Sequence, residues 1–222
     1  MTDHIVAIIE IIGGAAFALS GAAVAIEHRL DIFGVLVLAL TTAAGGGVLR
    51  DIMLGVTPPM IFSNPVYLAV CLAVSVLFIL LTFFSRGRMF LDYKTRMQSF
   101  INIVDAVGLG IFAALGTKAS LAVSRNYLLA VFIGTVTAVG GGILRDVSVA
   151  VPPRVFRKHI YAVAAIGGCV IYCILTKTVP EWAALSVSVI SVIAVRVLAS
   201  HFRWNLPIIS DGQGSEKSSF DK

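Results

Sequence analysis

Hydrophobic residues follow one another along this chain in long runs that short polar breaks separate. Seven of these runs are long enough to cross a bilayer core of about 30 Å as a helix, which takes about 17–25 residues. They are apolar on all sides, whereas the strands of a membrane β-barrel alternate in polarity over about ten residues. The pattern therefore predicts an all-α protein with seven transmembrane helices, at residues 5–26, 32–55, 65–84, 99–121, 127–149, 159–177 and 182–200.

The composition supports a location in a membrane. Apolar residues make up 58% of the chain and charged residues only 13%, and the mean hydropathy is +0.96. Water-soluble domains carry about 25% charged residues. The first four residues contain none of the Lys or Arg that precede the apolar core of a signal peptide. We therefore expect the first run to be a helix of the folded protein.

The second part of the chain repeats the first. A shift of 95 residues places Glu10 on Asp105, and it places GGGVLRD at 45–51 on GGGILRD at 140–146. Each copy holds three predicted helices, so the second copy must enter the membrane from the opposite side. The expected organisation is a first repeat at 1–84, a basic cytoplasmic linker at 85–98, an inverted second repeat at 99–177, a seventh helix at 178–200 and a cytoplasmic tail at 201–222.

Lys and Arg are divided unevenly between the two sides that the seven helices define. The side that holds the N-terminus receives four of the 17 basic residues, and the other side receives thirteen. Because short basic loops stay in the cytoplasm, we expect the N-terminus outside and the C-terminus in the cytoplasm. This bias accounts for the sequence pI near 9.3, so the charge gives no reason to expect a nucleic-acid partner.

The two glycine triplets interrupt the second and fifth predicted helices about two-thirds of the way along. Three adjacent glycines cost a helix about 1 kcal/mol each relative to alanine, so we expect kinked or partly unwound helices there. Backbone groups freed at that depth are tolerated where they line a watery cavity, as in transport proteins. Close helix packing is the competing interpretation. The candidate pore or hinge residues are Gly45, Gly46, Gly47, Gly140, Gly141 and Gly142.

Six charged residues recur at equivalent positions in both copies and are candidates for the walls of a pathway. Acids within transmembrane helices are costly and are often functional, although an acid in the second turn also complements the helix dipole. Adjacent residues point about 100° apart on a helix, so we expect each Arg and the Asp after it to find partners on other helices. A basic side chain that reaches the membrane surface is the alternative. The candidates are Glu10, Arg50, Asp51, Asp105, Arg145 and Asp146.

Catalytic and metal-binding patterns are missing from the sequence. It contains no nucleophile with a nearby base, no cluster of metal ligands and no phosphate-binding loop. Cys169 and Cys173 share one helical face, but no His or acid accompanies them, so we expect them to pack in the core. The sequence therefore predicts a protein that is not an enzyme and holds no metal or cofactor.

With its two GGG(V/I)LRD motifs, two three-helix units and a seventh helix, the sequence resembles the prokaryotic TRIC family of trimeric intracellular cation channels. Bacterial members also carry a glycine-transporter domain label. The resemblance implies a homotrimer in a bacterial inner membrane, with a pore in each protomer lined by the second and fifth helices. It implies permeant potassium or sodium, and membrane lipid as a partner. Animal members have a phosphoinositide-binding lysine before the glycines, where this chain has Ala44 and Val139; such lipid gating is not expected here.

Two kinds of transport remain open at this point, together with a membrane scaffold that transports nothing. In a channel, the glycine breaks would form a continuous wet path for cations, with potassium preferred. In a secondary transporter, the same breaks would hold glycine or another small solute between opposing helix ends.

Overall fold

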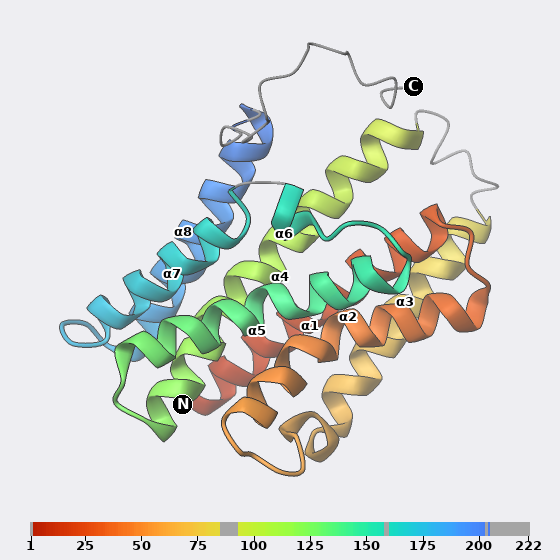
Figure 1. The fold of residues 1–222 in the computed structure, drawn as a ribbon. Helices are drawn as coiled ribbons and strands as arrows, with labels where there is room; N and C mark the ends of the chain where they lie inside the picture. The colour runs from red at the N-terminus through yellow and green to blue at the C-terminus, as the bar shows by residue number, and fades with distance from the viewer. Residues whose placement is uncertain (1, 85–92, 158–159, 203, 205–222) are drawn as a thin grey trace.

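The computed structural model describes residues 2–84, 93–157, 160–202 and 204, and all regular structure in these segments is helical (Figure 1). Within these described segments, six helices are long and apolar enough to cross a membrane: α1, α2, α3, α4, α5 and α8. The elements are α1 (Thr2–Glu27), α2 (Ile32–Met53), the 3₁₀ turn η1 (Met60–Ser63), α3 (Pro65–Phe84), α4 (Tyr93–Val123), α5 (Tyr127–Ser148), α6 (Arg154–Arg157), α7 (Ala162–Leu175) and α8 (Glu181–His201).

The sixth expected membrane helix is shorter than the hydrophobic run at 159–177 predicts. Helix α7 has 14 residues, and at 1.5 Å per residue it extends about 21 Å, less than the hydrocarbon core. It begins only after its N-cap Tyr161 and ends at Leu175, before its C-cap Thr176. The count of seven spanning helices is therefore not confirmed.

The expected linker at 85–98 also differs. Residues 85–92 lie outside the described residues, as does nearly all of the tail at 201–222, while 93–98 already belong to α4. In water, capping and not hydrophobicity determines where a helix ends. The hydrophobic run of α4 therefore begins later than the helix itself.

Equivalent residues of the two copies cap the equivalent helices. The side chain of Asp31 accepts a hydrogen bond of 2.7 Å from the backbone N of Gly34 at the start of α2. Asn126, 95 positions later, accepts from the backbone N of Leu128 and Leu129 at the start of α5. Such caps satisfy donors that a helix start leaves free, and here they fix where each glycine-containing helix begins.

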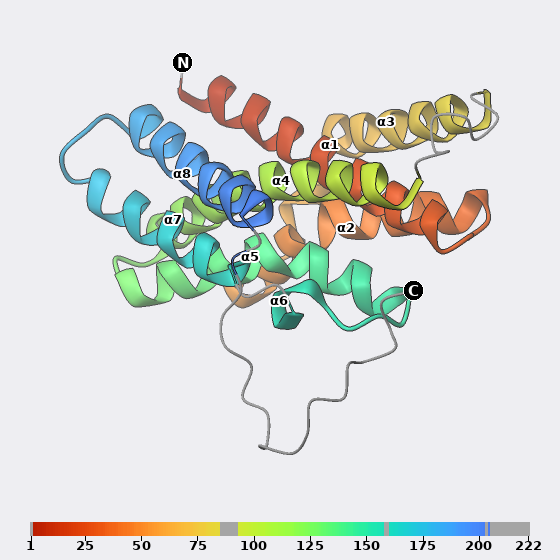
Figure 2. The ribbon, with the colours of Figure 1, turned by 90° about the horizontal axis from the view of Figure 1, so that it is seen from above.

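Helices α1, α2, α4 and α5 form the centre of the molecule. Helix α3 packs on α1 and α2 at one side, and α7 and α8 pack on α4 and α5 at the other (Figures 1 and 2). The rings of Phe17 on α1 and Phe112 on α4, which occupy equivalent positions in the two copies, stack with centroids 5.2 Å apart. The centre is thus built from matching parts of the two copies.

Candidate functional site

The glycine triplets lie where α2 crosses α5. A Cβ atom at Gly46 would be 2.1 Å from the carbonyl oxygen of Thr137, and one at Gly141 would be 2.1 Å from that of Thr42. A shift of 95 residues exchanges these two contacts, and the paired residues run in opposite directions along the two helices. The two backbones therefore touch at an antiparallel crossing that only glycine permits.

The expectation of unwound helices is wrong. Helix α2 is continuous from Ile32 to Met53 and α5 from Tyr127 to Ser148, through all three glycines of each triplet. Helical hydrogen bonds cannot be given up cheaply inside a membrane, so the glycines are used for close approach and not for a break. Close helix packing, the competing interpretation, accounts for the positions of Gly46 and Gly141 at the crossing.

The third glycine of each triplet distinguishes the two copies. A Cβ atom at Gly47 would meet nothing within 4 Å, because this glycine faces a cavity. A Cβ atom at the equivalent Gly142 would lie 2.8 Å from the hydroxyl oxygen of Tyr161 and 3.7 Å from a terminal nitrogen of Arg145. The same position is open in the first copy and filled in the second.

Each Arg pairs with the Asp that follows it, which corrects the expectation that adjacent residues point too far apart. Arg50 Nε donates to Asp51 Oδ1 at 2.8 Å, and Arg145 Nε donates to Asp146 Oδ1 at the same distance. The Arg side chain is long enough to fold back, so its inner nitrogen meets the neighbouring carboxylate.

The second oxygen of each of these Asp side chains holds the loop that follows the helix. Asp51 Oδ2 accepts from the backbone N of Met60 at 2.8 Å, and Asp146 Oδ2 accepts from that of Arg154 at 2.9 Å. Both acids are buried. They therefore have a structural role that is the same in both copies.

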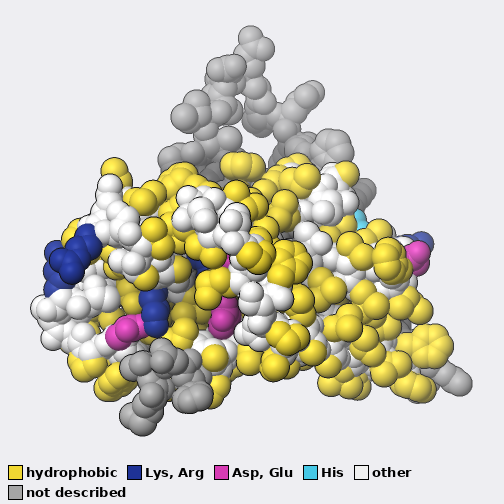
Figure 3. All heavy atoms as spheres, turned by 90° about the horizontal axis from the view of Figure 1, so that it is seen from below, with side chains coloured by type: hydrophobic (Ala, Val, Ile, Leu, Met, Phe, Trp, Pro, Cys, Tyr) yellow, Lys and Arg dark blue, Asp and Glu magenta, His cyan; other side chains and the backbone are white. Residues whose placement is uncertain are grey.

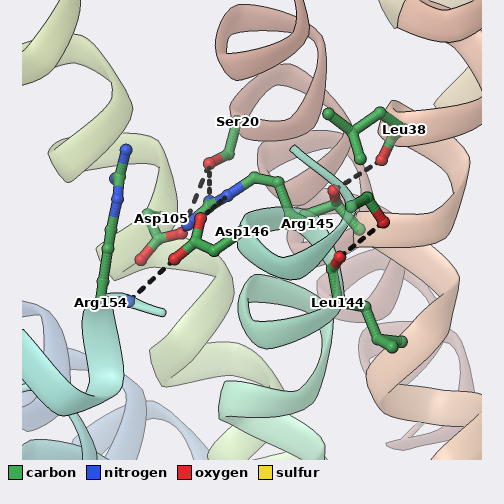
Figure 4. Close-up of polar contacts among 9 residues, drawn as sticks. Ser20, Leu38, Asp105, Leu144, Arg145, Asp146 and Arg154 are labelled. Carbon is green, nitrogen blue, oxygen red and sulfur yellow. Dashed lines mark hydrogen bonds and ion pairs between the residues drawn. The ribbon is translucent and has the colours of Figure 1, made fainter. Parts of the chain in front are cut away.

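In the second copy, Arg145 also binds residues from two other helices. Its Nη1 atom donates to Asp105 Oδ1 on α4 at 2.6 Å and to Ser20 Oγ on α1 (Figure 4). Arg145 and the Asp105 side chain are fully buried. We call Ser20, Asp105, Arg145 and Asp146 the Arg145 cluster. It joins α4 to α5 through an ion pair that is shielded from solvent, where charge interactions are strong, and it joins α1 to both through the hydrogen bonds of Ser20.

Further polar groups surround the Arg145 cluster. The guanidinium of Arg196 lies 4.6 Å from the ring centre of Tyr161. Burial lowers the pKa of the Arg154 guanidinium, and the charge of Arg145 lowers it further. Buried polar atoms in native proteins nearly always have a protein or water partner. Those in this region that lack a protein partner among the described residues are Asp105 Oδ2, Arg145 Nη2, Arg154 Nη1, Tyr161 Oη and Arg196 Nε.

In the first copy, the residue equivalent to Asp105 has no such partner. Glu10 is half-buried, and in the described part of the chain its carboxylate forms no hydrogen bond and no ion pair within 4.0 Å. It lines a cavity of about 80 Å³, which we call the Glu10 cavity. The other lining residues are Ala43, Ala44, Gly47, Arg50, Asp51, Met60, Ile61, Asn64, Tyr67 and Phe112.

A second cavity of about 310 Å³, the apolar cavity, adjoins the first. Glu10, Arg50, Asp51 and Met60 line both cavities. Its remaining wall is formed by Val6, Leu54, Val56, Leu115, Lys118, Ala119, Ala122 and Val123. Three of the six charged candidates are thus gathered at the junction of these cavities, and the other three belong to the Arg145 cluster.

Several residues of these sites were not singled out from the sequence. Ser20 and Arg196 gave no signal, because a lone serine and a terminal arginine are common in membrane helices. Tyr67 and Tyr161 were detectable, since they coincide at a shift of 94 residues. Tyr67 Oη donates to the carbonyl of Ala43 at 2.7 Å beside the first glycine triplet.

The sequence model of the glycine-transporter family matches this chain twice, at residues 7–82 and 102–177. The UPF0126 inner membrane protein YadS of Escherichia coli K12 is 35% identical over 203 residues, covering 90% of this chain and 93% of the relative. The UPF0126 membrane protein YvgT of Bacillus subtilis is 30% identical over 202 residues, covering 90% and 94%. Solved structures of TRIC channels decide the family.

A structure described as the basis for conductance through TRIC cation channels has 36% identity and a TM-score of 0.80, covering 93% of this chain and 98% of that one. A TRIC orthologue from Rhodobacter sphaeroides has 31% identity and a TM-score of 0.80, covering 90% and 99%. A prokaryotic TRIC channel in 0.5 M KCl has 32% identity and a TM-score of 0.83, covering 91% and 99%.

The chain belongs to the prokaryotic TRIC family. Like its relatives, this TRIC chain is a multi-pass membrane protein. Hydrophobic side chains cover most of the face seen in Figure 3, and charged ones are confined to a few places. Large apolar side chains such as Phe33, Phe83, Phe84 and Leu128 are at least 75% exposed, which suits contact with lipid.

Proposed function

We propose that this protein is a monovalent-cation channel that prefers potassium and has a pore in each protomer. The observation that carries the proposal is the Glu10 cavity, a space beside Gly47 on α2 whose wall contains the charged side chains of Glu10, Arg50 and Asp51. It is supported by the likeness over nearly the whole chain to TRIC cation channels, one of them studied in KCl. A free carboxylate in a cavity attracts cations and repels anions.

The pore runs from the Glu10 cavity to the Arg145 cluster, along one face of the α2–α5 crossing. Phe112 lines the Glu10 cavity, and its ring stacks on that of Phe17. In this proposal the stacked rings and the buried Arg145–Asp105 ion pair close the pore. Opening requires that Arg145 leave Asp105 and that the rings separate.

The proposal includes the arrangement in the membrane. The two copies are inserted in opposite directions in a bacterial inner membrane, with the N-terminus outside, and three protomers assemble. The double match of one family model and the exchange of contacts at the α2–α5 crossing support the inverted repeat. The basic-residue bias of the sequence supports the orientation. Trimeric assembly rests on the relative from Rhodobacter sphaeroides, which is described as a trimeric channel.

Recording in planar bilayers under a KCl gradient tests the channel. The purified full-length protein should give discrete unitary currents that reverse toward the potassium equilibrium potential. Gly47→Met should suppress the currents by filling the Glu10 cavity. Gly167→Met on α7 is the matched control, since a Cβ atom at Gly167 also meets nothing within 4 Å and this residue does not line the Glu10 cavity. Equal currents in both variants would remove the cavity from the pathway.

A secondary transporter of glycine or another small solute is the second candidate. The matched family model is described as a glycine transporter, and the Arg145 cluster offers unpaired donors beside an unpaired carboxylate oxygen, as a zwitterion requires. Saturable uptake of labelled glycine into liposomes, without unitary currents, would favour this candidate over the channel.

A further inference from the structure

The apolar cavity has the size and wall of a small-molecule site. Its volume of about 310 Å³ lies at the lower end of the 300–1,000 Å³ typical of ligand pockets, so it suits a compact ligand. Side chains from α1, α4 and the end of α2 surround it, and most of them are aliphatic. Such a wall favours apolar groups that fill the space and displace water.

One unpaired negative charge lies at the inner end of this cavity. Among the charged residues of its wall, Arg50 pairs with Asp51, and Lys118 pairs with Glu181. The carboxylate of Glu10 alone has no direct partner in the described part of the chain. A partly buried charge is stabilised by an opposite charge, so the site selects a cation.

The second copy shows that this combination is particular to the first. Ser20, which binds Asp105 and Arg145, is replaced at the equivalent position by Leu115, which lines the apolar cavity. Met60, in the wall of the cavity, has Arg154 as its equivalent. In the second copy, polar side chains thus contact Asp105, whereas in the first copy Glu10 lies beside an aliphatic wall.

We propose that the apolar cavity and the Glu10 carboxylate together bind organic monocations of the tetraalkylammonium class. The positive nitrogen lies toward Glu10, and the alkyl arms contact the aliphatic wall formed by Leu54, Leu115 and Ala119. Each CH₂ group that becomes buried should strengthen binding about three- to fourfold, until the cavity is full. Binding at this site does not require that the protein conduct ions, and a bound cation would cover the way into the Glu10 cavity.

Calorimetric titration of the purified full-length protein in detergent tests the binding. The probes are the chlorides of tetramethyl-, tetraethyl- and tetrapropylammonium, with NaCl added to keep the ionic strength constant. Affinity should rise along the series. Absence of heat from all three probes at two well-separated temperatures would overturn the proposal, as would an acyl chain in the cavity that the probes do not displace.

Two variants separate the charge from the wall. Glu10→Gln should lose most of the affinity for all three probes, while Glu27→Gln, the same change at the other end of α1, should bind as the unaltered protein does. Ala119→Leu narrows the apolar cavity but leaves the Glu10 cavity, so it should weaken tetrapropylammonium more than tetramethylammonium. Equal binding to Glu10→Gln and Glu27→Gln would overturn the proposal.

Bilayer recordings distinguish the organic-cation site from the proposed channel. Tetrapropylammonium added to the side of the N-terminus should reduce potassium currents of the unaltered protein more than those of Ala119→Leu, which narrows the apolar cavity and leaves the Glu10 cavity unchanged. Currents that persist while the probes fail to bind would leave the channel standing and remove the organic-cation site. Binding of the probes without any current would support the organic-cation site and contradict the channel.

Discussion

The two halves of this protein use equivalent residues for opposite purposes. In the second half, Arg145, Asp105 and Ser20 form a fully buried network between three helices. In the first half, the equivalent Glu10 has no direct partner among the residues that the structure describes, and it lines two cavities. The comparison teaches that a repeated motif fixes the fold, while the residues around it decide whether its acid is buried in ion pairs or faces a cavity.

Three substitutions between the copies account for this difference. Aspartate is one methylene shorter than glutamate, so Asp105 stays close to α5. Ser20 adds a hydroxyl that bridges Asp105 and Arg145, where the first half has Leu115. Arg154 adds positive charge near Asp105, where the first half has Met60. Each change favours a compact ion pair in the second half and an open carboxylate in the first.

The largest effect that tests the comparison is loss of the buried acid. Asp105→Asn should lower the free energy of unfolding by about 3–5 kcal/mol, because it leaves part of the Arg145 charge buried without its partner. Glu10→Gln in the first half should cost about 1 kcal/mol or less, since no direct ion pair is lost. Unfolding of both variants in detergent, followed by circular dichroism, measures the difference. Equal losses would mean that the halves are energetically alike.

A smaller effect is expected where the halves are alike. Gly46→Ala and Gly141→Ala should each cost about 1–3 kcal/mol, because the new methyl group would push the backbones of α2 and α5 apart. The two losses should be similar, since each Cβ atom would be 2.1 Å from a carbonyl oxygen of the other helix. Thermal unfolding measures them, with Gly167→Ala as the control. A loss in one variant alone would show that the crossing is not reciprocal.

The smallest effect concerns the third glycine. Gly142→Ala should cost about 1 kcal/mol, because the methyl group would press on the Tyr161 hydroxyl. Gly47→Ala should be neutral or stabilise by up to about 1 kcal/mol, since alanine favours helix and the space beside Gly47 is open. The same thermal assay compares the pair. If Gly47→Ala destabilises as much as Gly142→Ala, the first half is packed as closely as the second.

Much of the fold was predictable from hydrophobic run lengths and from the repeat. The six long helices lie at the runs that predict them, and the double match of the family model confirms the two similar segments. The glycine triplets were misread as helix breaks. Helix propensity counts only local costs, whereas inside a membrane the gain from close backbone contact and from retained hydrogen bonds outweighs them.

The candidate site was predictable in its residues but not in its pairing. All six charged candidates lie in the two polar regions, yet the fold-back of Arg50 and Arg145 onto Asp51 and Asp146 depends on side-chain rotamers that the sequence does not reveal. The difference between the halves lay in the mismatches of the repeat, such as Ser20 against Leu115. Matches between copies locate a shared scaffold, and mismatches locate where the copies have diverged.

The reciprocal contacts of Gly46 with Thr137 and of Gly141 with Thr42 limit how the two copies can change independently. Neither copy alone determines what the α2–α5 crossing tolerates, because the backbone of the other copy limits the size of the side chain at each of these glycines. The copies differ instead at positions away from this contact, such as Ser20 in one copy and Leu115 in the other.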